Sequence, residues 1–587
     1  MTFKQRKGYI MNRLNSKYKL AVMLVPALSI GHLCAQPIRW NVLFFISDEH
    51  SPHFMSIDSQ LPQNISTPNL ERLAKGGIIF DKAYVAFPVC APTRASLITG
   101  EYPQTHRQLG NSEYLVEAGP TGKTPSLGLL FRAEGYNTAL LGKTHSNVQL
   151  WDANPGMLFQ GKELFIGFDY RLDAPDNSRH PDVPAHIPSD AIWNQKQNLY
   201  LNKYPEAIKG QDAPAWQKAV IDSTKNQFFN TNPLDHASGH KDGVLVFDAL
   251  DYLDQYATGR TSTGQTSSDF KITNRSNPFF LYISVVQPHW PEASPKMQDS
   301  IDFYSMYSGR PEDDNGTYWY KTGMRKKIVP VAFTKEELAF TMKGFPGYGT
   351  VYEGKIPLET LRLLRARYSS SVSWVDHLLG KVMDKLEELD DPNNPGKKLS
   401  QTTIVVYTTD HGDMMGEKYR LVKLVMQEAA ARIPFIIRMP GVIPAGQRSN
   451  ILFNHVDMLP TVAGLCGLGP KLRPGLAGKD LSAAVIRNNA SMGPERTFSV
   501  CKINADPRVH PGYVMGRSQQ FKLIRFSARQ ANGLPYMALF DMDNDPHETK
   551  NLADDPRFAE VLDRESAAID KFLLKFGVPP VNLKVGK

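Results

Sequence analysis

The stretch NVLFFISDEH, residues 41–50, decides the predicted fold, because an uncharged run leads directly into three polar residues. A continuous apolar run such as residues 41–47 is typical of a β-strand that is buried on both faces. It ends at once in Asp48, Glu49 and His50. We therefore expect an interior strand of a parallel sheet with polar side chains at its carboxyl end, where open α/β sheets bind their ligands.

Three further stretches repeat this pattern. Residues 136–141 (YNTALL), 279–286 (FFLYISVV) and 402–409 (TTIVVYTT) also read as buried strands, and each is followed by polar residues. Those polar ends are, in the same order, GKTH at 142–145, QPHWP at 287–291 and DHGD at 410–413. Because the carboxyl ends of parallel strands meet at one edge of a sheet, the four polar ends are expected to lie together.

Helical segments alternate with these strands. Thr67 is expected to cap a helix that begins at Pro68 and stops at Gly76, and residues 361–385 form an amphipathic pattern. The alternation predicts an α/β fold with a large, mainly parallel, doubly wound sheet. Short strands after residue 496, such as FKLIRF at 521–526, predict a smaller C-terminal antiparallel α+β subdomain.

The domain boundaries follow from these patterns. Residues 1–35 read as a signal peptide, with six basic residues followed by a 14-residue apolar stretch at 20–33 that is too short for a confident membrane span. Residues 36–490 are expected to form the main domain, with a loop-rich insertion at 146–277, and residues 491–587 the C-terminal subdomain. The protein is thus predicted to be exported, periplasmic or secreted, without a transmembrane anchor. The bulky Leu33 disfavours a lipoprotein anchor at Cys34.

Composition excludes several classes of protein. The chain has 587 residues, of which 41% are hydrophobic and 21% charged, as in ordinary globular proteins. Residues 1–35 carry six basic residues and no acidic ones, so removing six from the net charge of +8 leaves +2. No basic stripe remains to indicate nucleic-acid binding. Outside the leader the chain has three cysteines, too few for a disulfide framework.

The stretch VCAPTRASLITG, residues 89–100, places Cys90 two residues before Pro92 and four before Arg94. Cys90 could be half of a disulfide, a metal ligand, a thiol nucleophile or the precursor of a modified residue. Asp48 and Glu49 end one strand, and Asp410 and His411 end another. Two such pairs on one sheet edge indicate a hard divalent cation held by oxygen atoms. A cationic group that suits an anionic substrate accompanies them: Arg94, Lys143, His145, His289 and Lys423.

Taken in order, these stretches resemble the type I, formylglycine-dependent sulfatases of the alkaline phosphatase superfamily, here of the bacterial exported kind. The resemblance covers nearly all of the chain after the leader. The matching stretches are 41–50, 66–84, 88–100, 135–145, 279–291, 407–417 with Lys423 beyond it, 431–441 and 539–552. Cys-x-Pro-x-Arg alone is a moderate signal, whereas the ordered set is very specific.

The resemblance implies that Cys90 is oxidised to Cα-formylglycine by a maturation enzyme that reads Cys90, Pro92 and Arg94. One hydroxyl of the hydrated aldehyde would attack sulfur and form a covalent sulfo-enzyme. Deprotonation of the other hydroxyl would expel sulfate and restore the aldehyde. A simple alcohol lacks this exit.

The family's roles are carried over by position. Asp48, Glu49, Asp410 and His411 would bind the cation beside residue 90. The family usually holds Ca²⁺, but His411 stands where many members have Asn, and a nitrogen ligand keeps Mn²⁺ and Zn²⁺ open, with Mg²⁺ as a further alternative.

The remaining roles concern the sulfate group and protons. Arg94 would hold the hydrate and the nearby acids, and His145 would accept the proton that triggers sulfate release. His289 would donate a proton to the leaving alkoxide, and Lys143 and Lys423 would hold sulfate oxygens.

Two alternatives to a sulfatase stay open from the sequence. A phosphonate or phosphate monoester hydrolase of the same superfamily would share the Asp410–His411 pair, but the complete cationic group favours sulfate. A non-catalytic protein of this fold would be expected to lose Cys90, Arg94 or a metal ligand, and this chain has lost none of them.

The substrate is expected to be a sulfated glycan, such as a glycosaminoglycan-type fragment, because an exported enzyme with a long loop-rich insertion suits a bulky ligand. A choline-sulfatase-like substrate is the alternative, since Trp290 could stack on a quaternary ammonium group as well as on a sugar. His50, His106 and His455 are expected to be structural. The candidate substrate contacts are Trp290, Glu292, His240, Arg420 and His510.

Overall fold

The computed structural model divides the chain into two units, Met1–Ile38 and Arg39–Lys587. It describes residues 39–58, 65–106, 108–111, 126–143, 168–172, 238–262, 270–289, 333–339, 357–501, 512–531 and 535–578. The predicted signal peptide and nearly all of the predicted insertion lie outside these residues. Within the described residues no helix is long and apolar enough to span a membrane.

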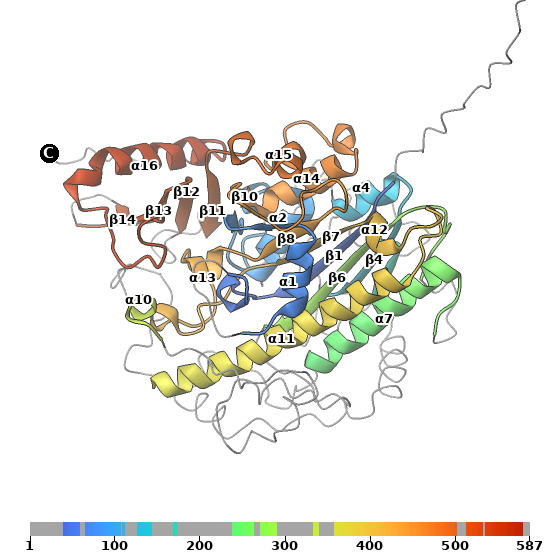
Figure 1. The fold of residues 1–587 in the computed structure, drawn as a ribbon. Helices are drawn as coiled ribbons and strands as arrows, with labels where there is room; N and C mark the ends of the chain where they lie inside the picture. The colour runs from blue at the N-terminus through green and yellow to red at the C-terminus, as the bar shows by residue number, and fades with distance from the viewer. Residues whose placement is uncertain are drawn as a thin grey trace, which may run out of the picture. The chain divides into compact units, whose positions relative to one another are not determined.

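A large sheet forms the centre of the second unit (Figure 1). Its strand order is β5-β4-β6-β1-β7-β8-β2-β9. From β5 to β7 neighbouring strands are parallel, whereas β8 is antiparallel to both β7 and β2. The strands are β1 Asn41–Asp48, β2 Ile78–Phe80, β4 Asn137–Gly142, β5 Tyr170–Leu172, β6 Phe279–Pro288, β7 Thr403–Thr409, β8 Phe435–Arg438 and β9 Gln447–Ser449. The expected mainly parallel sheet is confirmed.

Strand β1 is buried along its whole length and faces a different core on each side. Val42, Phe44 and Ile46 belong to one apolar cluster, and Leu43 and Phe45 to the other. Successive side chains of a strand point to opposite faces, so a continuous apolar run is what a strand between two helical layers requires.

Helices cover both faces of the sheet. Helices α7 (Ser238–Thr258) and α11 (Leu358–Glu388) run side by side along one face, where α1 (Pro68–Lys75) also packs (Figure 1). Helices α2 (Cys90–Thr99), α4 (Leu127–Ala133) and α14 (Met458–Leu465) contribute to the other core. Among the described residues, the shorter α-helices are α3 Pro103–His106, α10 Lys335–Leu338, α12 Leu399–Thr402, α13 Glu428–Ala431 and α15 Ser482–Arg487.

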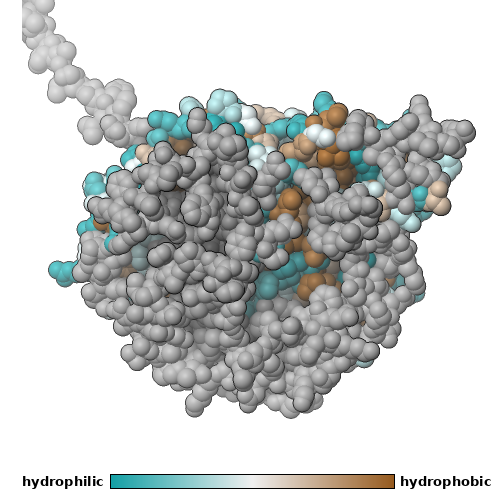
Figure 2. Space-filling model, turned by 180° about the vertical axis from the view of Figure 1, so that it is seen from behind, coloured by the Kyte–Doolittle hydropathy of each residue, from teal (hydrophilic) through white to brown (hydrophobic). Residues whose placement is uncertain are grey.

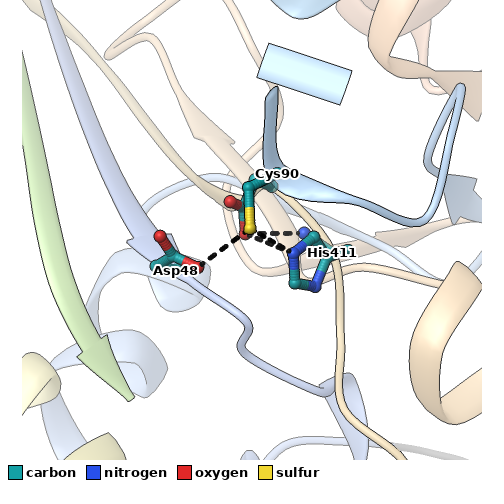
Figure 3. A group of neighbouring side chains, drawn as sticks. Asp48, Cys90 and His411 are labelled. Atoms are coloured by element: carbon teal, nitrogen blue, oxygen red, sulfur yellow. Dashed lines mark hydrogen bonds and ion pairs between the residues drawn. The ribbon is translucent and has the colours of Figure 1, made fainter. Parts of the chain in front are cut away.

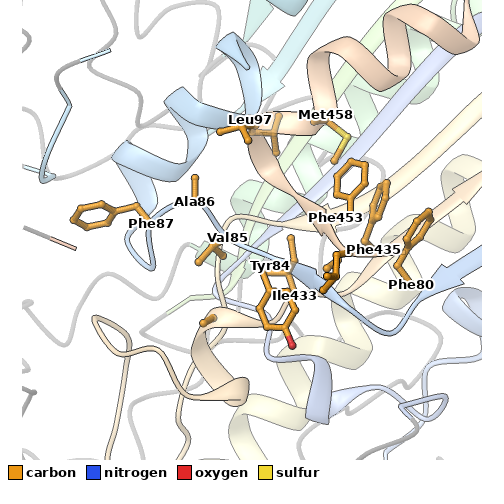
Figure 4. Packing of buried hydrophobic residues seen from close by; sticks show 14 of the residues in the cluster. Phe80, Tyr84, Val85, Ala86, Phe87, Leu97, Ile433, Phe435, Phe453 and Met458 are labelled. Atoms are coloured by element: carbon orange, nitrogen blue, oxygen red, sulfur yellow. The ribbon is translucent and has the colours of Figure 1, made fainter. Parts of the chain in front are cut away.

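Phenylalanines pack closely where β2, β8 and a short parallel pair meet (Figure 4). The short pair is β3 (Ala83–Tyr84) with β10 (Phe453–Asn454). The ring centroid of Phe435 lies 4.5 Å from that of Phe80 and 4.3 Å from that of Phe453. Such ring pairs add to the stability that apolar burial supplies.

The C-terminal part forms a separate antiparallel sheet, as expected. Its strands are β11 Thr497–Cys501, β12 Tyr513–Arg517, β13 Phe521–Arg529 and β14 Pro535–Asp541, paired in that order. Helix α16 (Ala559–Leu574) packs on β12 and β13. On the face shown in Figure 2, apolar and hydrophilic residues of the described part lie interspersed.

One local expectation differs in detail. Thr67 precedes α1 as predicted, but its hydroxyl does not cap the helix and instead bonds the hydroxyl of Ser56 at 2.7 Å. The carboxylate of Asp376, on α11, accepts the amide hydrogens of Asn69 and Leu70 at 3.1 and 2.8 Å. A side chain from another helix therefore satisfies donors that helix starts leave open.

Candidate active site

Side chains from several strand ends and one helix start meet at the carboxyl edge of the parallel strands. Asp48 ends β1, Lys143 follows β4, His289 follows β6 and Asp410 follows β7. Cys90 is the first residue of α2, whose ten residues are all buried. Asp48 and His411 approach the Sγ atom of Cys90 from opposite sides in the view of Figure 3.

Four of these side chains have the character of a metal site. The ligand atoms of Asp48, Cys90, Asp410 and His411 all lie within 4.8 Å of one another, and all four residues are buried. The Nδ1 atom of His411 lies 2.9 Å from the carbonyl oxygen of Gly412, so Nδ1 carries a proton and Nε2 faces the group. Two carboxylates and one imidazole nitrogen fit a divalent cation. Burial opposes the charged form of His411, but Asp410 raises the pKa of His411 to about 9, so a cation must displace a proton there.

Arg94 holds the carboxylates of Asp48 and Asp410 together. Its Nε atom donates to Asp410 at 2.9 Å and its Nη2 atom to Asp48 at 3.2 Å. The Nη1 atom donates to the carbonyl oxygen of Lys143 and to the hydroxyl of Ser284, both at 2.8 Å. A guanidinium is the only side chain with enough fixed donors for such a set.

Lys143 forms an ion pair with the carboxylate of Asp48. Burial opposes ionisation of Asp48, but Lys143, His289 and Arg94 together hold its pKa well below the usual range. The carboxylate is therefore charged at neutral pH and available to a cation.

A second group lies beside the first. The Nζ atom of Lys423 is 3.1 Å from the Sγ atom of Cys90, 3.1 Å from Nε2 of His289 and 3.2 Å from Oε2 of Glu49. Glu49 also lies 3.3 Å from His289. Glu49 thus contacts two cationic groups, and its role as a metal ligand stays a prediction.

Burial would lower the pKa of His289 and of Lys423, but neighbouring acidic groups outweigh it. Glu49 and Asp48 raise the pKa of His289 despite the opposing effect of Lys423. Cys90 and Glu49 raise the pKa of Lys423 well above its usual value. Both side chains are therefore poised to carry a proton where an anion and a leaving group would meet.

Two glycines allow the backbone to come close at this edge. A Cβ atom on Gly412 would lie 2.0 Å from the carbonyl oxygen of Ala429. A Cβ atom on Gly142 would lie 2.0 Å from the carbonyl oxygen of Ser284, and Gly142 also has φ +101°. The Asp-His-Gly and Gly-Lys sequences therefore need glycine for steric reasons.

Two supporting residues were not foreseen from the sequence. Ser284 accepts from Arg94, and its only signal is a hydroxyl inside an apolar strand. Tyr368 of α11 donates its hydroxyl to the carbonyl oxygen of Glu49 and accepts from the amide of Ser51 at 2.7 Å. It stabilises Glu49 at φ +65°, an unfavourable conformation for a non-glycine residue. A tyrosine on an amphipathic helix gives no sequence signal of this contact.

The other predicted residues fall into three groups. The side chains of His145, Trp290, Glu292 and His510 lie outside the described residues, as does that of His240, although its backbone belongs to α7. Arg420 lies among the described residues and is buried. Its contact with the substrate stays a prediction. The histidines expected to be structural are buried and bonded within the protein, His50 to Tyr407, His106 to Ser96 and His455 to Thr93.

Comparison with known proteins agrees with this geometry. A family model described as Sulfatase matches residues 40–468, and one described as N-sulphoglucosamine sulphohydrolase, C-terminal, matches residues 416–573. The Ulvan-active sulfatase of Formosa agariphila is 25% identical, with 92% of this chain and 82% of that protein covered. The N-acetylglucosamine-6-O-sulfatase of Bacteroides thetaiotaomicron is also 25% identical, with 92% and 88% covered.

A solved structure shares the fold. The phosphonate monoester hydrolase of Agrobacterium radiobacter superimposes with a TM-score of 0.60 at 20% identity, and 92% of this chain and 95% of that chain are covered. This likeness shows a shared fold. Because the first model matches more than half of the chain, the protein belongs to the sulfatase family, and it is a sulfuric ester hydrolase.

Proposed function

We propose that the protein removes sulfate from a sulfated carbohydrate, with Cys90 converted to Cα-formylglycine and a divalent cation bound beside it. One observation carries this proposal. The Sγ atom of Cys90 lies 3.1 Å from Nε2 of His411 and 3.1 Å from Nζ of Lys423. Residue 90 therefore lies between a metal-ligand group and a cationic group, the position that a nucleophile attacking a bound anion must occupy.

The cation would be held by Asp48, Asp410 and His411, with Glu49 as a further ligand. Ca²⁺ is the first choice, and the imidazole of His411 keeps Mn²⁺, Zn²⁺ and Mg²⁺ as alternatives. When bound, the cation and the formylglycine hydrate supply an activated hydroxyl nucleophile.

The chain's own residues would bind the sulfate and move protons. Lys143 and Lys423 hold sulfate oxygens, and Arg94 keeps the carboxylates in place. His289 carries a proton at Nε2 for the departing alcohol, and His145 accepts one when sulfate leaves. Asp48, Arg94, Asp410 and His411 are buried, and Lys143, Lys423 and His289 are partly buried. Charges in such a site interact more strongly than they would in water.

A carbohydrate substrate is supported by the relatives, since one is named an ulvan-active sulfatase and another an N-acetylglucosamine-6-O-sulfatase. The Asp410–His411 pair also suits a phosphonate or phosphate monoester hydrolase, and a hydrolase of phosphonate monoesters shares the fold. The two lysines and His289 in one group favour sulfate. We also propose that residues 1–35 direct the protein to the periplasm or the medium, and that a formylglycine-generating enzyme modifies it.

The test is release of free sulfate from a panel of sulfated mono- and disaccharides and from choline sulfate. The expected result is release from at least one sugar, with Cys90→Ala as the inactive control. Release from choline sulfate alone would overturn the carbohydrate substrate. Assays with 4-nitrophenyl sulfate and a phosphonate monoester, run in parallel, address the reaction. Equal or faster phosphonate turnover would overturn sulfate as the preferred ester.

A further inference from the structure

The buried carboxylate of Asp242 binds the strand that leads to His289. Asp242 lies near the start of α7. Its Oδ1 atom accepts the amide hydrogen of Val286 at 2.7 Å, and its Oδ2 atom accepts that of Gln287 at 2.9 Å. Both carboxylate oxygens thus bind consecutive backbone donors of β6. Bonds of this kind, to a charged acceptor, are about twice as strong as neutral ones.

These two donors lie where β6 leaves the regular sheet. Ile46 pairs with Ser284, but Asp48 pairs with Pro288, so β6 has two extra residues opposite β1. On the other side, the described pairing with β4 ends with Gly142 opposite Ser284. The bulge removes the usual ladder partners of the amides that follow. Buried amides need partners, and Asp242 supplies them.

The bulge connects directly to His289. The amide of His289 donates to the carbonyl oxygen of Val286 at 3.0 Å. Asp242 accepts the amide hydrogen of Val286, and the carbonyl oxygen of Val286 accepts that of His289. Val286 therefore links the carboxylate to the backbone of His289. The imidazole then reaches Lys423 and Glu49 through Nε2, at 3.1 and 3.3 Å.

We propose that Asp242 is a positioning residue that aims the imidazole of His289 at the leaving oxygen of the substrate. This inference rests on the proposed function, in which His289 protonates the departing alcohol. An Asn side chain offers one acceptor and an NH₂ group that would face a second N–H donor, so one amide would lose its partner. The bulge would then relax and His289 would move, with the anion-binding lysines left in place.

A comparison of leaving groups separates this role from a purely structural one. A sugar alkoxide is a poor leaving group that needs a proton, whereas 4-nitrophenolate leaves with little help. For Asp242→Asn we expect kcat on a sulfated sugar to fall by about 10- to 100-fold, and kcat on 4-nitrophenyl sulfate by about threefold or less. A loss of folded protein would lower both values by one common factor.

The matched control is Asp248→Asn on the same helix. Asp248 is also buried, and it accepts the hydroxyl of Tyr170 at 2.7 Å. This variant is expected to change kcat on the two substrates by the same factor. If Asp242→Asn does not fold, Asp242→Glu is the alternative, because it keeps both acceptors and displaces them by one methylene. We again expect a larger loss of kcat on the sulfated sugar than on 4-nitrophenyl sulfate, but a smaller difference between the two.

Equal losses of kcat on the two substrates in a folded variant of Asp242 would overturn the inference, as would unequal losses in Asp248→Asn. A second comparison distinguishes failure of this inference from failure of the proposed function. Wild-type protein that releases no sulfate from either substrate contradicts that function. The inference alone is contradicted if the wild-type protein is active and His289→Ala lowers kcat more on the sulfated sugar than on 4-nitrophenyl sulfate, but Asp242→Asn does not.

Discussion

The Sγ atom of Cys90 lies 3.1 Å from Nε2 of His411, although 321 residues separate the two in sequence. Helix α2 begins at Cys90 and β7 ends two residues before His411. Among the described residues, Cys90, Cys466 and Cys501 form no disulfide. The tertiary structure thus directs the side chain of residue 90 to a group of side chains that could hold a metal ion, and among the described residues no disulfide involves it.

Cys90→Ala is expected to abolish sulfate release, because neither a thiol nor an aldehyde can then form at this position. Mass spectrometry of the peptide that contains residue 90 should show the change from thiol to aldehyde in the wild-type protein. Cys501→Ala, at a buried cysteine of β11, is the control and should retain activity. Fully active protein with an intact thiol at Cys90 would contradict formylglycine.

Arg94→Ala is expected to destabilise the fold by about 3–5 kcal/mol when cations are chelated, because Asp48 and Asp410 lose a shared buried partner. Urea unfolding in the presence of a chelator measures this change. Arg72→Ala removes an exposed pair with Asp384 and is expected to change stability by less than about 1 kcal/mol. Similar effects of the two substitutions would show that the buried network contributes little.

Removal of divalent cations should stop turnover, and adding them back should restore it. His411→Asn replaces an imidazole nitrogen with an amide oxygen, so reactivation should shift toward Ca²⁺ relative to Mn²⁺ or Zn²⁺. Elemental analysis of the purified protein together with reactivation assays measures both effects. Full activity in protein without any bound divalent metal would rule out the site.

Tyr513→Phe should raise KM for the sulfate ester by up to about tenfold, with a smaller effect on stability. The hydroxyl of Tyr513, on β12, donates to the carbonyl oxygen of Leu424, next to Lys423. Loss of this bond frees the backbone that presents the lysine. Tyr252→Phe is the control, because its hydroxyl donates to the carbonyl oxygen of Asn137, at the start of β4. An unchanged KM in Tyr513→Phe would contradict the prediction.

Asp376→Asn tests a pH-dependent contribution to stability. Burial raises the pKa of Asp376 to about 7, against its hydrogen bonds to Leu70 and Asn69. Between about pH 4 and pH 7 this side chain is therefore protonated in the folded state and ionised in the unfolded state. Wild-type stability gained from this proton is full below pH 4 and is lost as the pH rises to about 7.

Relative to Asp376→Asn, the wild-type protein should therefore lose roughly 3–4 kcal/mol of unfolding free energy between pH 4 and pH 7, with only a small further loss above pH 7. Urea midpoints measured across this range give the difference. Asp384→Asn, at an exposed position of the same helix, is the control. A pH-independent difference for Asp376→Asn would refute the prediction.

Much of the sheet could be predicted because its signals are local. The composition of the apolar runs at 41–47, 136–141, 279–286 and 402–409 indicates their burial, and each run contains most of a buried strand. The described site holds residues from all four polar ends: Asp48, Lys143, His289 and Asp410. The antiparallel direction of β8 had no such signal, because a four-residue apolar strand reads the same in either direction.

The supporting contacts could not be predicted. Asp376, Tyr368 and Asp242 lie on long helices whose patterns show only which side is apolar. Which backbone group each of them meets depends on how α7 and α11 pack on the sheet. A Thr before Pro68 indicated a cap, yet the cap came from Asp376, some 300 residues away.

By itself the sequence determined the alternation of strands and helices, the ordered motifs and the polar residues at each strand end. Residue type and local periodicity are sufficient for these. The tertiary structure decided which atoms meet: Cys90 with His411 and Lys423, and Arg94 with the carboxylates of Asp48 and Asp410. Such contacts join segments hundreds of residues apart, so they depend on strand order and helix packing, which no local pattern specifies.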